Sequence, residues 1–168
     1  MSLFIPTYHL NRLTDINIDL LKKLNIKTVL LDVDNTISSH NSLELFDGAL
    51  DWIDNLKAQN IKILIASNNY KRRVKPISKA INVDFLYFSL KPLPFRINRF
   101  LKNYNIKKSE TLIIGDQIFS DILFANLFGI KSILLEPQAA GKNSLTLKMK
   151  RKIEKYIKKS FKNKGANL

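Results

Sequence analysis

Short apolar segments alternate with amphipathic ones from residue 15 to residue 135, and this alternation is the strongest constraint on the fold. Apolar runs rich in β-branched residues predict buried strands, whereas apolar residues three or four positions apart predict helices. Strands are expected at 28–33, 61–66, 83–88, 111–114 and 130–135, and helices at 15–23, 47–59, 71–81, 94–104 and 118–128. We therefore expect an α/β fold, with a parallel sheet of about five strands and helices on both faces.

The composition excludes several classes of protein and site. The chain has 168 residues, of which 45% are hydrophobic and 25% are charged, as in one compact globular domain. It contains no cysteine, so disulfides, thiolate metal sites and cysteine nucleophiles are excluded. Its formal net charge of +14 favours anionic partners, such as nucleic acid, lipid headgroups or phosphorylated substrates.

No segment has the character of a transmembrane helix or of a secretory signal. The apolar runs are far shorter than the roughly 18 residues that a spanning helix needs. The first residues lack the basic start and long apolar core of a signal peptide. A cytoplasmic protein is expected, and peripheral attachment to a membrane surface is left open.

Polar residues follow four of the predicted strands. They are Asp32, Asp34 and Thr36 after the first strand, Ser67 and Asn68 after the second, Lys91 after the third, and Asp116 and Asp121 after the fourth. In parallel sheets, ligand sites lie beyond the carboxyl ends of the strands. These side chains should therefore meet in one crevice.

The acidic residues of this set predict a cation. Asp32 and Asp34 project to the same side of an extended chain. Two like charges about 4 Å apart repel by roughly 4 kcal/mol at an effective dielectric constant of about 20, and Asp116 adds to this repulsion. Such a cluster either takes up protons or holds a cation. Oxygen ligands without a nearby histidine or cysteine point to Mg²⁺.

The same arrangement suits the hydrolysis of a phosphate ester. A bound phosphate would contact the cation, Ser67 and Lys91, and one carboxylate would be free to attack phosphorus. A second carboxylate could protonate the leaving oxygen and then activate water. Ordinary turn chemistry at Ser67 and a surface position for Lys91 are the simpler alternatives, and Asp121 could equally face solvent.

These motifs resemble those of the haloacid-dehalogenase (HAD) superfamily of phosphohydrolases. An apolar strand followed by Asp-x-Asp-x-Thr matches residues 30–36, a strand ending in Ser matches 63–67, a lysine matches Lys91, and Gly-Asp with a further acid matches 115–121. The match covers roughly residues 25–135. The form Asp-x-Asp-Asn-Thr, with Lys-Pro and Gly-Asp-Gln, is similar to the YqeG branch, which is related to phosphatases that act on phosphatidylglycerophosphate. Asn35 departs from the glycine that many relatives have.

The resemblance implies a three-layer Rossmann-like fold and a role for each residue. Asp32 resembles the nucleophile and Asp34 the general acid and base. The Asp32 side chain, the Asp34 backbone carbonyl and Asp116 resemble the ligands of Mg²⁺. The phosphate-binding residues are expected to be Ser67, Asn68 and Lys91, and the supporting ones Thr36 and Asp121.

The spacing of the motifs leaves no room for a cap domain. Each interval, from Thr36 to Ser67 and from Ser67 to Lys91, is filled by one predicted helix and one predicted strand. An uncapped site suits a large substrate, or a headgroup presented by a membrane, better than a small metabolite. We expect a phosphatase domain at residues 1–141.

Residues 142–168 are expected to form a basic amphipathic helix or tail. From Lys142 to Lys164 there are ten Lys or Arg and one acid, Glu154, with apolar residues four positions apart. Such a helix can lie on anionic lipid or contact nucleic acid, or it can simply pack on the domain. The leading hypothesis is a phosphatase for a phosphatidylglycerophosphate-type lipid. The alternatives are a phosphatase for nucleic-acid ends or phosphoproteins, and an RNA- or ribosome-binding module with a vestigial site.

Overall fold

The computed structural model describes residues 3–40 and 42–138. Its strands are β1 (Tyr8–Leu10), β2 (Thr28–Leu31), β3 (Lys62–Ala66), β4 (Asp84–Leu86), β5 (Thr111–Gly115) and β6 (Lys131–Leu135). Its α-helices are α1 (Ile18–Lys23), α2 (Ala49–Ala58), α3 (Lys71–Ala80), α4 (Phe95–Asn103) and α5 (Leu123–Phe128). Short helical turns are η1 (Leu13–Asp15), η2 (Lys108–Glu110) and η3 (Ile118–Ile122), the last of which is π-helical. The predicted basic tail, residues 142–168, lies outside the described residues.

All of the strand pairs are parallel, and the strand order is β1-β6-β5-β2-β3-β4. The chain builds outward from β2 to β4, then crosses back so that β5 pairs with the other side of β2. The carboxyl ends of β2 and β5 therefore lie together where the winding direction changes, which is where open α/β sheets place their ligand sites.

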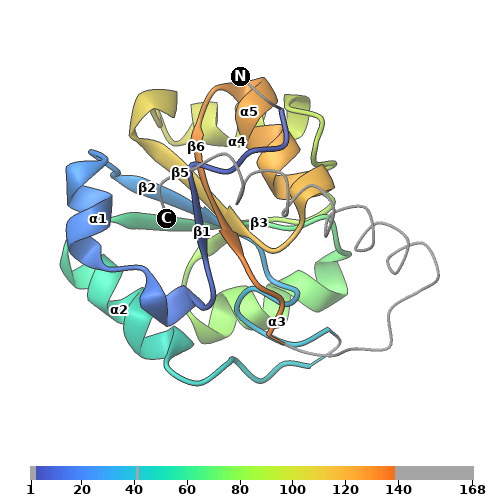
Figure 1. Cartoon of the computed structure of the whole chain (residues 1–168). Coiled ribbons are helices and arrows are strands. Elements are labelled where there is room, and N and C mark those ends of the chain that lie inside the picture. The colour runs from blue at the N-terminus through green and yellow to red at the C-terminus, as the bar shows by residue number, and fades with distance from the viewer. Residues whose placement is uncertain (1–2, 41, 139–168) are drawn as a thin grey trace.

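Alternation of side chains along the strands produces the three layers. In β2, Val29 and Leu31 join the core beneath α1, α2 and α3, whereas Leu30 joins the core beneath α4 and α5. Figure 1 shows α4 and α5 on one side of the sheet and α2 and α3 on the other. The predicted α/β fold, a parallel sheet with helices on both faces, is confirmed.

Strand β1 was not predicted from the sequence. This edge strand has only three residues and lies beside β6. Its place is fixed by neighbouring polar groups, because the Ser132 backbone N–H donates to Thr7 Oγ1 at 3.0 Å and the His9 and Glu136 side chains meet at 2.8 Å. Three residues of mixed polarity carry no alternation long enough to predict a strand.

The connections that follow β2 and β3 are short. Among the described residues, one α-helix lies between β2 and β3, and one lies between β3 and β4. This is the arrangement that the motif spacing predicts for a chain without a cap domain. None of the helices in this part of the chain combines the length and apolar character that a bilayer crossing requires.

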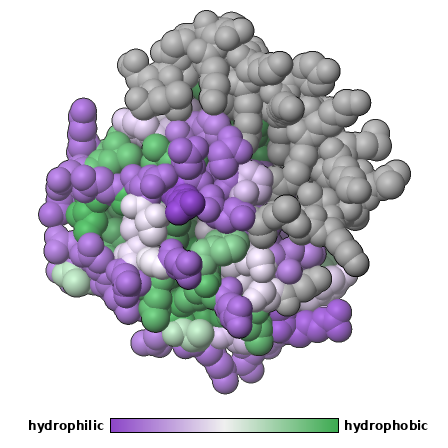
Figure 2. Space-filling view, turned by 60° about the horizontal axis from the view of Figure 1, so that its bottom comes forward, coloured by the Kyte–Doolittle hydropathy of each residue, from purple (hydrophilic) through white to green (hydrophobic). Residues whose placement is uncertain are grey.

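The face that lies at the bottom of Figure 1, where α2 and α3 are found, comes forward in Figure 2. Hydrophilic side chains cover much of it, and hydrophobic ones gather in clusters between them. The outward positions of α3 account for part of the hydrophilic surface, since Lys71, Arg72, Lys75 and Lys79 are exposed. Val74 and Ile77, on the opposite side of this helix, are buried in the core.

Candidate active site

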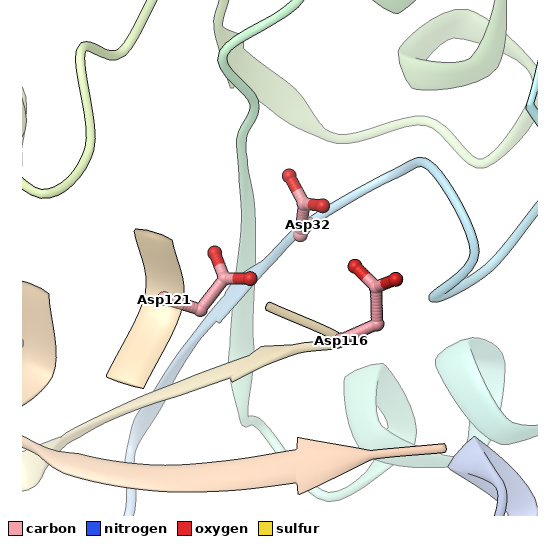
Figure 3. A group of neighbouring side chains, drawn as sticks. All are labelled: Asp32, Asp116 and Asp121. Atoms are coloured by element: carbon pink, nitrogen blue, oxygen red, sulfur yellow. The ribbon is translucent and has the colours of Figure 1, made fainter. Parts of the chain in front are cut away.

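Three carboxylates converge beyond the ends of β2 and β5. Asp32 follows β2, Asp116 follows β5, and Asp121 lies in η3. One oxygen from each carboxylate lies within 4.8 Å of an oxygen of the other two. Figure 3 shows the three carboxyl groups pointing to the same side of the chain. The structure thus brings Asp32 and Asp116 together, as the sequence predicts, and places Asp121 beside them.

Backbone geometry explains why these groups meet. The Asp32 N–H donates to the Ile114 carbonyl at 3.0 Å, which continues the pairing of β2 with β5 past the end of the strand. Asp121 is brought inward by η3, whose wider turn is marked by the Ile122 N–H reaching back to the Gln117 carbonyl. The Gln117 N–H in turn donates to Asp121 Oδ2 at 3.1 Å.

Lys91 holds two of these carboxylates together. Its Nζ lies 2.9 Å from Asp32 Oδ1 and 2.6 Å from Asp121 Oδ1, and it donates to the Ala66 carbonyl at 2.6 Å. The ammonium is almost fully enclosed, with a side-chain exposure of 1%. Burial opposes its charge, but the carboxylates of Asp121 and Asp32 outweigh burial and raise the pKa of Lys91. Lys91 is therefore a permanent cation at the base of the site.

At Asp32, in contrast to Lys91, burial outweighs the attraction of the neighbouring opposite charge. The pKa of Asp32 is raised from 3.8 to about 8, because burial and the repulsion of Asp121 and Asp116 together outweigh the attraction of Lys91. One ammonium does not compensate three carboxylates. An ionised Asp32 at neutral pH therefore calls for additional positive charge.

A divalent cation fits this donor set. The three buried groups offer only carboxylate oxygens, which hard cations prefer. Asp32 and Asp116 would hold the ion, as predicted, while Asp121 is already committed to Lys91 and the Gln117 backbone. The family resemblance implies that Asp34 contributes its backbone carbonyl to the ion, and the Asp34 side chain contacts other partners.

Asp34 is held by a buried arginine that the sequence analysis missed. Arg73 Nε and Nη2 lie 3.1 and 2.9 Å from Asp34 Oδ1. The same guanidinium donates to the Ser39 carbonyl at 3.0 Å and also to the Ser42 carbonyl. Asn69 Nδ2 donates to Asp34 Oδ2 at 3.0 Å, and His40 Nδ1 lies 3.6 Å from Oδ1. Arg73 thus fixes Asp34 and ties the neighbouring loop to α3.

The helical spacing of the sequence places Arg73 on the buried side of its helix, but the basic residues around it concealed this signal. It precedes Val74 and lies four positions before Ile77, two residues that face the core. In a helix with the sequence Lys-Arg-Arg-Val-Lys, one arginine on the buried face resembles its exposed neighbours. Asn69 and His40 lie in loops, where no periodic pattern distinguishes them.

Two of the predicted phosphate-binding residues, Ser67 and Asn68, line one pocket together with Asp32 and Asp34. The pocket has a volume of about 230 Å³, and Asn69 lines it as well. Asn68 is also structural, since its Oδ1 accepts from the Lys91 N–H and the Ser89 hydroxyl at 2.8 and 2.7 Å, and its Nδ2 donates to the Lys91 carbonyl. Its amide therefore locks the segment that carries Lys91.

The turn after Asp34 explains the departure at Asn35. Asn35 has a φ of 58°, in the left-handed region where glycine and asparagine are the residues most readily accommodated. Thr36 follows in the same turn, and its N–H donates to the Val33 carbonyl. Thr36 is 1% exposed, so its predicted supporting role would be structural, inside the turn.

Gly115 is the position where a side chain would destroy this geometry. A Cβ there would lie 2.3 Å from Asp121 Cγ and 2.8 Å from Asp121 Cβ. Gly115→Ala should therefore push Asp121 away from Lys91, with a loss of about 1–3 kcal/mol in the free energy of unfolding. Urea denaturation measures this loss, and the rise in Tm on adding Mg²⁺ should shrink. Because the clash is with Asp121, the cost should be smaller in an Asp121→Ala background; strictly additive costs would contradict this account.

The raised pKa of Asp32 predicts a pH-dependent stability for the metal-free protein. A carboxyl group with a higher pKa in the folded state stabilises folding at low pH and loses that contribution as pH rises, here between about 4 and about 8. Asp32→Asn removes the titration, so the variant should become more stable than wild type as pH rises through this window, by on the order of a few kcal/mol at pH 8. Urea unfolding in a chelator at several pH values measures the difference. A stability difference independent of pH would refute the assignment.

Comparison with known proteins places the chain in a family. It matches the family model described as mitochondrial PGP phosphatase over residues 1–138. It is 32% identical over 162 residues to "Probable phosphatase YqeG" of Bacillus subtilis, covering 96% of this chain and 94% of that protein. It is 24% identical over 170 residues to phosphatidylglycerophosphate phosphatase 1, chloroplastic/mitochondrial, of Arabidopsis thaliana; 96% of this chain aligns with 49% of that protein, so the chain spans about half its length.

Solved structures share the fold at low sequence identity. The deoxy-D-mannose-octulosonate 8-phosphate phosphatase of Haemophilus influenzae aligns with a TM-score of 0.54 at 16% identity, over 68% of this chain and 70% of that one. The D,D-heptose 1.7-bisphosphate phosphatase of B. bronchiseptica aligns with a TM-score of 0.53 at 17% identity, over 66% of this chain and 80% of that one. The family model and the Bacillus relative show that the chain belongs to the PGP phosphatase family, and it is a phosphatase, a hydrolase of phosphoric monoesters.

Proposed function

We propose that this phosphatase works through an aspartyl-phosphate on Asp32, depends on Mg²⁺, and acts on a phosphatidylglycerophosphate-type lipid. The observation that carries the covalent mechanism is the contact of Lys91 with Asp32, whose side chain lines the pocket. A buried carboxylate that lines a pocket and has a fixed ammonium beside it can approach an anionic phosphate, because the ammonium offsets their mutual repulsion.

The reaction has two steps in this site. An Asp32 oxygen attacks phosphorus, the bond from phosphorus to the substrate alcohol breaks, and Asp34 gives its proton to the departing oxygen. Asp34 then takes a proton from a water molecule, which attacks the aspartyl-phosphate and releases inorganic phosphate and the free Asp32 carboxylate. Mg²⁺, held by Asp32, Asp116 and the Asp34 carbonyl, would neutralise the phosphate oxygens as charge develops on them.

The contacts of Asp34 suit these alternating roles. Arg73 binds Oδ1, whereas Oδ2 meets the neutral amide of Asn69. These two contacts hold the carboxyl group in one orientation, with Arg73 on one oxygen and Asn69 on the other. Arg73 acts through Asp34, so it is a positioning residue.

The three proposed phosphate-binding residues have different roles. Ser67 lines the pocket, and Lys91 supplies charge from beneath. Asn68 lines the pocket too, but its amide is bonded to the backbone of Lys91. We assign it mainly to fixing that lysine, with Asp121 holding the ammonium from the other side.

A membrane lipid is the substrate class that best suits the chain. The site is formed by a domain whose β2–β3 and β3–β4 connections each hold a single α-helix, so a bulky headgroup can reach it. The Arabidopsis relative is named for phosphatidylglycerophosphate. We assign catalysis to residues 1–141 and attraction to anionic lipid to the basic residues within 142–168, each of which contributes roughly 1 kcal/mol near such a surface. The enzyme would then act as a peripheral protein on the cytoplasmic side.

The covalent step is tested by trapping. Asp32→Asn should reduce phosphate release from p-nitrophenyl phosphate by about 10³-fold or more, because the nucleophile is lost. Asp34→Asn should still form the aspartyl-phosphate from this substrate, whose leaving group needs no proton, but should hydrolyse it slowly. Acid quenching and mass spectrometry should therefore detect a phosphorylated Asp32 in the Asp34→Asn variant and an unmodified residue in Asp32→Asn. Full turnover by Asp32→Asn would refute the mechanism.

The substrate class is tested with a panel of phosphomonoesters at equal concentration, with Mg²⁺ and with chelator. Phosphatidylglycerophosphate in vesicles should give a kcat/KM at least about tenfold above that for a 5′-phosphorylated oligonucleotide, a phosphopeptide or a sugar phosphate. Chelation should abolish turnover of all four. Preference for the oligonucleotide or the phosphopeptide would contradict the lipid assignment and identify that compound's class as the substrate. RNA binding without any hydrolysis would favour a vestigial site.

A further inference from the structure

Large apolar side chains are exposed together on the segment that carries Lys91. We define the interfacial loop as residues 87–95. Its exposed apolar residues are Tyr87, Phe88, Leu90, Leu93 and Phe95. Phe95 is 75% exposed and Leu93 52%, and several exposed apolar side chains on one segment mark an interaction surface more clearly than single ones do. Tyr70, 61% exposed, extends this surface, because its ring lies 5.6 Å from that of Phe88.

The loop is firmly attached to the active site. The Phe88 N–H donates to the Asn69 carbonyl and the Ser89 N–H to the Ser67 carbonyl, both at 2.9 Å. Side chains alternate in direction along the loop: Ser89 and Lys91 point inward and are buried, whereas Phe88 and Leu90 point outward. The apolar surface therefore lies beside the pocket, on the same backbone that positions the ammonium.

Basic residues surround this apolar surface. Between residues 67 and 103 there are nine Lys or Arg, of which Arg73 and Lys91 are buried in the site, and one acid, Asp84. Lys71, Arg72, Arg96 and Arg99 are exposed. Two of them lie near aromatic rings of the surface, Lys71 at 5.8 Å from the Tyr87 ring centroid and Arg72 at 5.9 Å from that of Tyr70. Apolar residues flanked by cations are the pattern of a surface that enters the headgroup region of an anionic membrane.

We propose that the interfacial loop and Tyr70 dock the enzyme on an anionic lipid bilayer, with Leu93 and Phe95 inserted among the lipids and the flanking cations on the headgroups. This rests on the proposed function, because it explains how a membrane-bound phosphate ester reaches the pocket. A lipid surface is favoured over single-stranded nucleic acid because Leu90 and Leu93, which are 42% and 52% exposed, offer no ring for stacking on a base.

Vesicle binding by the full-length protein tests the proposal without any turnover. The Leu93→Gln/Phe95→Gln variant is compared with Leu50→Gln/Leu127→Gln, which removes two exposed leucines from α2 and α5. Co-sedimentation uses vesicles of phosphatidylglycerol and phosphatidylcholine at high salt, which screens the basic tail. The loop variant should bind about tenfold more weakly or worse, and the control should remain within about twofold of wild type. Equal binding of both variants would overturn the proposal.

A fluorescence assay covers the case in which the double variant folds poorly. Leu93→Trp places a reporter on the loop, against the constant background of Trp52, which is 8% exposed. Vesicles should shift its emission to shorter wavelength. No shift, or a shift produced only by single-stranded RNA, would overturn lipid docking. If the loop binds vesicles but the phosphatidylglycerophosphate in them is not hydrolysed, the docking surface stands and the proposed substrate fails.

Discussion

The ammonium of Lys91, enclosed between Asp32 and Asp121, is the interaction on which the site depends. Two unit charges about 4 Å apart interact by about 4 kcal/mol at an effective dielectric constant of about 20, so three neighbouring carboxylates would force one another to take up protons without it. With the ammonium in place, Asp32 still has a pKa of about 8. The protein therefore supplies part of the positive charge itself and leaves the rest to a cation or to protons.

The sheet makes this arrangement possible, because it brings residues from separate segments to one edge. Asp32 reaches the end of β5 because its N–H continues the pairing with Ile114. Asp121 comes close only because η3 is wide and Gly115 has no side chain. Regular strands thus place the first two carboxylates, whereas local irregularities place the third. Irregular backbone of this kind is common where structure serves a site.

The sequence predicted what depends on periodicity and on the order of motifs, and missed what depends on single contacts. The strands at the sheet centre and the meeting of Asp32 with Asp116 follow from apolar runs and the rule that sites lie at their carboxyl ends. Strand β1 was too short to predict, and Arg73 was concealed among basic neighbours on α3. The sequence did not decide whether Asp121 faces solvent or the site, and in the structure it is 1% exposed. Its burial depends on the absence of a side chain at Gly115, six residues earlier, and only the fold brings that glycine beneath it.

The segment after β4 places Lys91 in the buried site and exposes apolar side chains to solvent. Phe88 and Leu90 have φ values of 51° and 62°, a left-handed conformation that bulky residues rarely adopt. This strain is compensated by the Asn68 amide and by backbone bonds to Ser67 and Asn69. The exposed apolar residues are therefore not a packing defect, because the geometry that buries the lysine obliges its neighbours to face outward.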